Sequence, residues 1–150
     1  MVESKKKIVL VSADEEAGIS RKMVVWVNTF PDSPVGFINY EQLDDNSNSM
    51  ALSTIQGTYI TRRFICGGYE AEYQFKLVYR IFVGNSNDAR LTADELLNTF
   101  GDWATTQKPY IGDGIRVLKI EPTTRSSLFA AYDDGTEDHQ IIMRMTYEVI

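Results

Sequence analysis

The stretch GYEAEYQFKLVYRIFV, residues 68–83, decides the fold of this 150-residue chain. Apolar and aromatic side chains occupy its odd-numbered positions from Ala71 to Val83, and polar side chains occupy most of the even ones. Val78 and Phe82 are the exceptions. Because successive side chains of a strand point to opposite faces, this alternation predicts one long β-strand with a single buried face. Other elements of the chain must cover that face.

Two helices are predicted to provide the cover. The first is expected to begin at Ser20 as N-cap and to end before Pro31, because apolar residues recur between them at helical spacing. The second is expected over residues 92–105, where Thr92 and Glu95 form a capping box and an apolar stripe follows. A glycine inside that stripe is expected to weaken the helix by about 1 kcal/mol relative to alanine.

Short apolar runs separated by turn residues predict further strands on both sides of the long one. Paired glycines at positions 67–68 and Asp-Gly at 134–135 favour tight turns, because both tolerate positive φ. Residues 8–11 fit either a strand or the start of a helix. The predicted strands are residues 35–43, 50–56, 59–66, 115–121, 126–132 and 140–150.

The order helix, strands, helix, strands predicts an α+β fold with a mixed, mostly antiparallel β-sheet and two helices packed on one face. With 43% hydrophobic residues, the chain can bury a core of its own. We expect residues 1–19 to form a partly flexible N-terminal segment and residues 20–150 to form a single domain.

The composition argues against several classes of function. The net charge of -6 and a pI near 4.8 argue against nucleic acid or an anionic membrane as the main partner. A single cysteine, Cys66, excludes an internal disulfide. No stretch is long enough and apolar enough to predict a membrane span.

The chain carries no recognisable catalytic, cofactor or metal motif. We interpret His139 as an exposed residue beside a hairpin turn, and Cys66 as a small buried core residue. Asp44 and Asp45, and Asp133 and Asp134 with Glu137 and Asp138, are interpreted as solvated turns, because Asp favours turns for backbone reasons. The sequence therefore predicts a protein that is not an enzyme. A buried cluster of converging ionisable groups would argue against that prediction.

Residues 57–69 are the best candidate for an interface. Basic and aromatic side chains interleave only here, and Arg and Tyr are enriched where proteins meet. The candidate interface residues are Tyr59, Thr61, Arg62, Arg63, Phe64 and Tyr69.

Several phrases in this order resemble the small minor capsid proteins in the head–tail genes of phages and prophages of Gram-positive bacteria. That group is similar in layout to the tail terminator proteins of long-tailed phages. The phrases are Lys22–Pro31, Met50–Gly57, Ile65–Tyr69, Ala93–Leu97 with Trp103, and Glu137–Gln140.

The resemblance implies a virion subunit that assembles with itself as a ring, commonly a hexamer. Such a ring caps the tail tube and faces the head connector, and its subunits are made in the host cytoplasm before they enter the virion. A position in the tube or the connector is a variant of this hypothesis. The alternative is a small-molecule-binding or catalytic domain with a pocket between helix 92–105 and the sheet.

Overall fold

The computed structural model describes residues 8–44 and 48–150. Residues 1–7 of the predicted N-terminal segment, and Asp45 of the first acidic pair, lie outside the described residues. The elements are β1 (Val9–Leu10), α1 (Ala13–Val27), β2 (Ile38–Tyr40), β3 (Ser49–Thr54), β4 (Tyr59–Arg63), β5 (Tyr69–Phe82), α2 (Asn87–Thr105), β6 (Ile115–Pro122), β7 (Ser127–Ala131) and β8 (Thr136–Val149).

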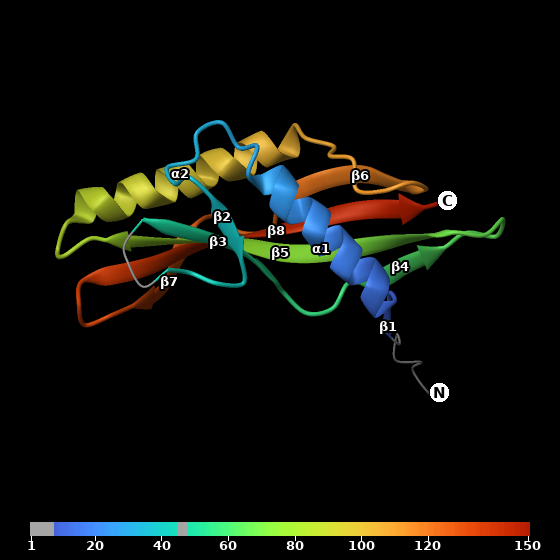
Figure 1. Cartoon of the computed structure of the whole chain (residues 1–150), viewed down its shortest axis with the longest axis horizontal. Helices are drawn as coiled ribbons and strands as arrows, with labels where there is room; N and C mark the ends of the chain where they lie inside the picture. The colour runs from blue at the N-terminus through green and yellow to red at the C-terminus, as the bar shows by residue number, and fades with distance from the viewer. Residues whose placement is uncertain (1–7, 45–47) are drawn as a thin grey trace, which may run out of the picture.

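Two fourteen-residue strands, β5 and β8, form the centre of an eight-stranded sheet (Figure 1). They pair antiparallel along their whole length, from Tyr69 opposite Val149 to Phe82 opposite Thr136. The far edge of β5 pairs with β4 and then β3, and the far edge of β8 pairs with β6 and then β7. Among the described strands only the β2–β3 pair is parallel, so the predicted mixed, mostly antiparallel sheet is confirmed.

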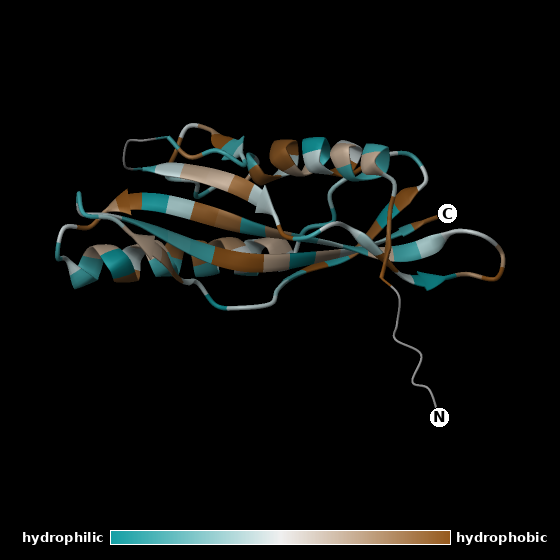
Figure 2. Cartoon of the chain, turned by 90° about the horizontal axis from the view of Figure 1, so that it is seen from below, coloured by the Kyte–Doolittle hydropathy of each residue, from teal (hydrophilic) through white to brown (hydrophobic). Residues whose placement is uncertain are grey.

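Both helices cover the same face of this sheet, as predicted. The odd-numbered residues of β5 from Ala71 to Val83 are buried against them, because this face carries the apolar half of the alternation. Figure 2 shows the alternation as hydrophobic and hydrophilic bands along the strands. The helices contribute Ile19, Met23, Trp26 and Val27 from α1, and Ala93, Leu97, Phe100 and Ala104 from α2.

Helix α1 begins eight residues earlier than predicted. Its N-cap is Ser12, whose hydroxyl accepts a hydrogen bond from the Glu15 backbone N–H at 3.1 Å, and three acidic residues occupy the first turn. Acidic groups there are favourable because the helix N-terminus carries partial positive charge. Ser20, the predicted cap, is buried inside the helix, and its hydroxyl lies 2.9 Å from that of Tyr73.

Helix α2 also begins one turn before the predicted start. Ser86 is the N-cap and accepts from the Ala89 N–H at 3.2 Å, whereas Thr92 lies exposed inside the helix. The added residues at the start of α2 carry no apolar stripe, so helical spacing of apolar residues did not predict them. The helix glycine is Gly101, where an added Cβ would lie 2.8 Å from Ile141 Cδ1. Gly101 therefore allows the helix to approach β8 closely.

The strands differ from the predictions mainly in length. The strand expected over 35–43 shortens to Ile38–Tyr40, held by the Asn28 side chain, which bonds both the N–H and the carbonyl of Ile38. The last strand is longer than predicted and begins at Thr136 instead of residue 140. Residues 8–11, left between two interpretations, contain the short strand β1.

The molecule is elongated along its central strands (Figure 1). The β4–β5 hairpin forms one end, together with the C-terminal end of β8. The turn after β5 and the β7–β8 turn form the other end, where Val83 and Gly84 donate backbone hydrogen bonds to the Gly135 carbonyl. No helix of the described part of the chain is long and apolar enough to cross a membrane.

Candidate interaction surface

The six predicted interface residues all lie in the β4–β5 hairpin, but they do not play one role. Tyr59 donates a hydrogen bond to the Glu72 carboxylate at 2.5 Å, which raises the pKa of the tyrosine. Tyr69 donates to Glu15 of α1, and burial together with this bond raises its pKa to about 12. These tyrosines fasten the hairpin to its own domain.

The two arginines differ from the tyrosines in being exposed to solvent. Arg62 and Arg63 are exposed, and their guanidinium groups lie 5.1 Å and 6.0 Å from the ring centroids of Phe64 and Tyr69. Thr61 donates a hydrogen bond to the Glu70 carboxylate at 2.9 Å, so this carboxylate is directed toward β4. The arginines are thus held in place by aromatic rings while their charges remain available to a partner.

The most exposed apolar side chain of this region is one that the sequence reasoning did not single out. Ile65 is 109% exposed at the end of the hairpin. Cys66 beside it is also exposed, so the interpretation as a buried core residue is wrong. The turn closes through Gly67 and Gly68, with φ of 95° and 84°, which confirms the predicted tight turn. We call residues 62–68 the hairpin tip.

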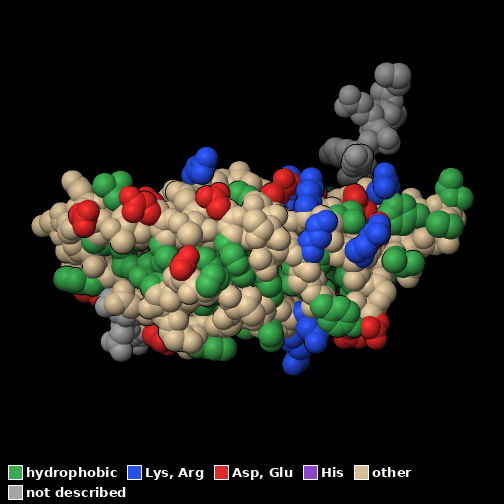
Figure 3. Space-filling view, turned by 90° about the horizontal axis from the view of Figure 1, so that it is seen from above, with side chains coloured by type: hydrophobic (Ala, Val, Ile, Leu, Met, Phe, Trp, Pro, Cys, Tyr) green, Lys and Arg blue, Asp and Glu red, His purple; other side chains and the backbone are tan. Residues whose placement is uncertain are grey.

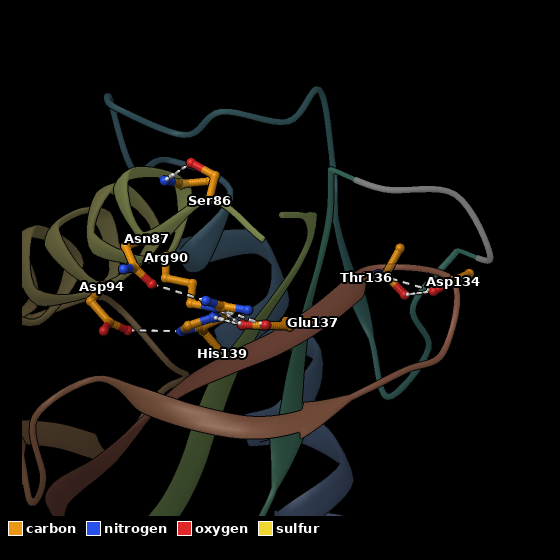
Figure 4. Close-up of polar contacts among 9 residues, drawn as sticks. Ser86, Asn87, Arg90, Asp94, Asp134, Thr136, Glu137 and His139 are labelled. Atoms are coloured by element: carbon orange, nitrogen blue, oxygen red, sulfur yellow. Dashed lines mark hydrogen bonds and ion pairs between the residues drawn. The ribbon is translucent and has the colours of Figure 1, made fainter. Parts of the chain in front are cut away.

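A buried ionic network lies between α2 and β8 (Figure 4). His139 Nδ1 is 2.9 Å from the Asp94 carboxylate, and Nε2 is 3.1 Å from Glu137. Arg90 Nε lies 2.8 Å from Glu137, and its Nη1 donates to Asn87. The interpretation of His139 as an exposed turn residue is therefore wrong, because it is 2% exposed inside a strand.

The neighbouring acid of the same strand points to the opposite face of the sheet. Asp138 is 1% exposed and accepts hydrogen bonds from Arg80 at 2.8 Å and from Tyr132 at 2.7 Å. The bond to Asp138 raises the pKa of Arg80 and also that of Tyr132. The solvated-turn interpretation therefore holds for Asp133 and Asp134, which are exposed, and fails for Glu137 and Asp138.

The charged side chains of the network have partners within it, which limits the chemical roles open to them. Both ring nitrogens of His139 have carboxylate partners, and the Glu137 carboxylate is shared with Arg90. His139 and Glu137 are almost completely buried, whereas the side chains of Asp94 and Arg90 at the rim of the network are 33% and 36% exposed. No group of three or more His, Cys, Asp or Glu residues in the described part of the chain could hold a metal ion. A buried, fully paired network of this kind fastens a helix to a sheet.

The inner side of α2 is packed, with Leu97, Phe100 and Ala104 at 0% exposure. A hollow of about 370 Å³ lies along the helix, between Asn98 and Asp102 and the turn that carries Arg125. The buried ionic pairs described above are not among its lining residues. Among the described residues, this hollow is the place that a ligand pocket between α2 and the sheet would use.

Comparison with known proteins gives no sequence match. No protein-family model matches the chain, and no curated protein matches it. A solved structure, "Virion of native gene transfer agent (GTA) particle", contains a chain that superposes with a TM-score of 0.61. The chain shares its fold with a protein of that virion. The match covers 89% of this chain and 97% of the other at 13% identity.

The gene transfer agent chain is matched over almost its whole length, so the common fold is the full α+β domain rather than one supersecondary unit. A second solved chain, 18% identical over 93% of this chain and 96% of its own, gives a TM-score of 0.39, too loose a superposition to argue from. At these identities the likeness concerns the fold and carries no residue of one chain onto the other.

A signal for the buried network was present in the sequence. Glu137 and His139 share the parity of the buried residues Ile141 and Met143, so extending the alternation of β8 backwards places both side chains on the core face. Their partners on α2 could not be found in this way, because Arg90 precedes the predicted helix and Asp94, although inside it, lies off its apolar stripe.

Proposed function

We propose that this chain is a structural virion protein, a tail terminator or head–tail joining subunit that assembles as a ring at the head-proximal end of the tail. The observation that carries the proposal is the fold shared with the gene transfer agent virion chain over nearly the full length of both. The proposed partners are copies of the chain itself, in a ring that is commonly a hexamer in the phage proteins it resembles, together with tail tube and head connector proteins.

The distribution of polar groups supports a binding role. The described ionisable groups that are buried deepest are paired within the domain, whereas Arg62, Arg63 and Ile65 project from one end. Exposed Arg and large apolar side chains at a rigid turn are suited to contact another protein. Such a subunit is expected to be made in the host cytoplasm and then to become part of the virion.

The net charge of -6 is consistent with a ring through which DNA passes. Lys and Arg contacts to phosphate would retain the DNA, so a lumen poor in basic residues favours sliding. We propose no specific nucleic-acid binding. Binding of the purified protein to duplex DNA at physiological salt, with a steep salt dependence, would contradict this part of the proposal.

Deletion of the gene from the phage or phage-like element that encodes the chain tests the function. Electron microscopy of the particles is expected to show tails of irregular, excessive length or heads and tails that are not joined. Adding the purified protein to the deletion lysate should restore joining. Particles of normal length and normal joining without the chain would overturn the proposal.

A further inference from the structure

The strand β5 connects two ends of the molecule that have opposite chemical character. It begins at Tyr69, beside the hairpin tip, and ends at Phe82. Fourteen residues at about 3.3 Å per residue place these ends roughly 45 Å apart. The hairpin tip therefore cannot reach the other end of its own domain, and any contact between the two ends must join two molecules.

The hairpin tip is basic and apolar. Arg62 and Arg63 are exposed, Ile65 is fully exposed, and the turn is ordered by backbone hydrogen bonds between Phe64 and Gly68 and between Gly67 and Phe64. An ordered turn loses little conformational entropy when it docks.

The opposite end is acidic and aromatic. Phe82, the last residue of β5, is 61% exposed, and Tyr132, the residue after β7, is 43% exposed. The Phe82 ring lies against Gly135, where an added Cβ would come within 2.8 Å of it. Asp133 and Asp134 precede that glycine and are both exposed. We call Phe82, Tyr132, Asp133 and Asp134 the acidic end patch.

Among the residues that the structure describes, no ion pair involves Asp133 or Asp134. Arg80 lies nearby and stacks on the Tyr132 ring at 5.1 Å, but its charge is matched by the buried Asp138. Asp134 accepts from the Thr136 N–H and hydroxyl, and these bonds lower the pKa of its carboxyl group, so the negative charge is retained. Figure 3, viewed from above, shows most of the basic side chains in the half of the molecule that holds the hairpin, and acidic side chains along its whole length.

We propose that the hairpin tip of one copy docks on the acidic end patch of the next copy. Arg62 and Arg63 would pair with Asp133 and Asp134, while Ile65 would cover the exposed aromatic rings. The two surfaces are different patches at opposite ends of one chain, so the contact is heterologous and repeats from copy to copy. Closure of that repeat gives a ring, so the inference rests on the proposed function and names the contact that builds it.

Charge reversal tests the contact by light scattering of the purified full chain. The variant Arg62→Glu with Arg63→Glu reverses the tip, and Asp133→Arg with Asp134→Asn reverses the patch while keeping an acceptor for Thr136. Each variant alone is expected to need about tenfold more protein to assemble, as for a loss of about 1.4 kcal/mol per contact. Circular dichroism checks that each remains folded.

Mixing the two variants is the decisive arm. Where the two variants alternate, each contact is either native or has its charges reversed, and like-charge repulsion disfavours contacts between copies of the same variant, so assembly should return toward the wild-type level. A single chain with all four changes should also assemble. If the wild type assembles and the separate variants assemble equally well, the contact is wrong although the ring, and the proposed function, stand.

Disulfide cross-linking tests the contact in the case that the wild-type chain stays monomeric in solution until it meets the tail. Cys66 in the tip is the only cysteine, so oxidation of the wild type can give dimers at most. With Asp133→Cys, oxidation is expected to give a ladder of disulfide-linked species beyond the dimer, which a reductant removes. The matched control, Thr105→Cys, places an exposed cysteine away from the patch and should give no ladder. Equal ladders, or none with Asp133→Cys, would overturn the inference, whereas the deletion experiment alone decides the proposed function.

Discussion

The indole of Trp26 stacks on that of Trp103, with ring centroids 5.2 Å apart and planes 12° from parallel. This contact joins α1 to α2 above the sheet. Phe100 lies beside both rings, and Phe75 of β5 meets the edge of Trp26. The two helices thus cover one face of the sheet as a connected layer, and the aromatic cluster between them is the place where that layer is most sensitive to change.

Replacing Trp26 by alanine is expected to lower the free energy of unfolding by about 3–5 kcal/mol, because a large buried side chain leaves a cavity. Urea titration followed by circular dichroism measures it. Trp26→Phe is the matched control. The indole N–H is buried without a hydrogen-bond partner among the described residues, so phenylalanine removes an unpaired donor and should cost less than about 1.5 kcal/mol. Equal losses for both variants would contradict this account of the cluster.

Replacing Arg90 by methionine is expected to destabilise the domain by about 1–3 kcal/mol, because the Glu137 carboxylate stays buried after losing its guanidinium partner. The double variant Arg90→Met with Glu137→Met removes both charges and should recover part of that loss, because His139 Nε2 also loses its Glu137 partner. A double-mutant cycle measured by thermal unfolding gives the coupling. If the loss of unfolding free energy in the double variant equals the sum of the losses in the two single variants, the two side chains do not act as a pair.

Gly101→Ala tests whether helix propensity or packing decides at that position. Propensity alone favours alanine by about 1 kcal/mol. The added Cβ would lie 2.8 Å from Ile141 Cδ1, so we expect Gly101→Ala to unfold at a lower urea concentration than the wild type. In an Ile141→Val background, which lacks Cδ1, the same change should raise the midpoint. If Gly101→Ala instead stabilises the protein when Ile141 is present, the Ile141 side chain or β8 must shift to make room for the added methyl group.

Stability is expected to fall at alkaline pH. Tyr69 and Tyr147 both donate to the Glu15 carboxylate, and burial with these bonds raises the pKa of each above the ordinary 10.0, to about 12 for Tyr69. Above pH 10 the unfolded chain releases these protons while the folded chain keeps them, so ΔG of unfolding decreases as pH rises. Below pH 10 the two tyrosines make their full contribution to the free energy of unfolding.

Urea midpoints measured from pH 8 to pH 11 test this pH dependence. The variant Tyr147→Phe should show a shallower decline above pH 10, because one of the shifted groups is gone. The exposed Tyr110 serves as a control, and Tyr110→Phe should leave the steepness of the decline closer to that of the wild type than Tyr147→Phe does. An unchanged slope in Tyr147→Phe would mean that its hydroxyl ionises alike in both states.

The sequence by itself determined the α+β class, the long central strand, the core face of that strand and the turns at Gly67–Gly68 and Asp133–Gly135. Each of these depends on local rules: period-two alternation, helical spacing of apolar residues, and the backbone freedom of glycine. Composition also singled out the segment of residues 57–69 as the interface candidate. Its use as an interface remains a proposal.

The tertiary structure alone decided which side chains the buried polar residues meet. His139 and Glu137 meet Asp94 and Arg90 because β8 lies beneath the first turns of α2, a relationship between segments more than 40 residues apart. It also placed the hairpin tip and the acidic end patch at opposite ends of the molecule. Pairings of this kind follow from how strands and helices pack, and local spacing along a chain carries no information about them.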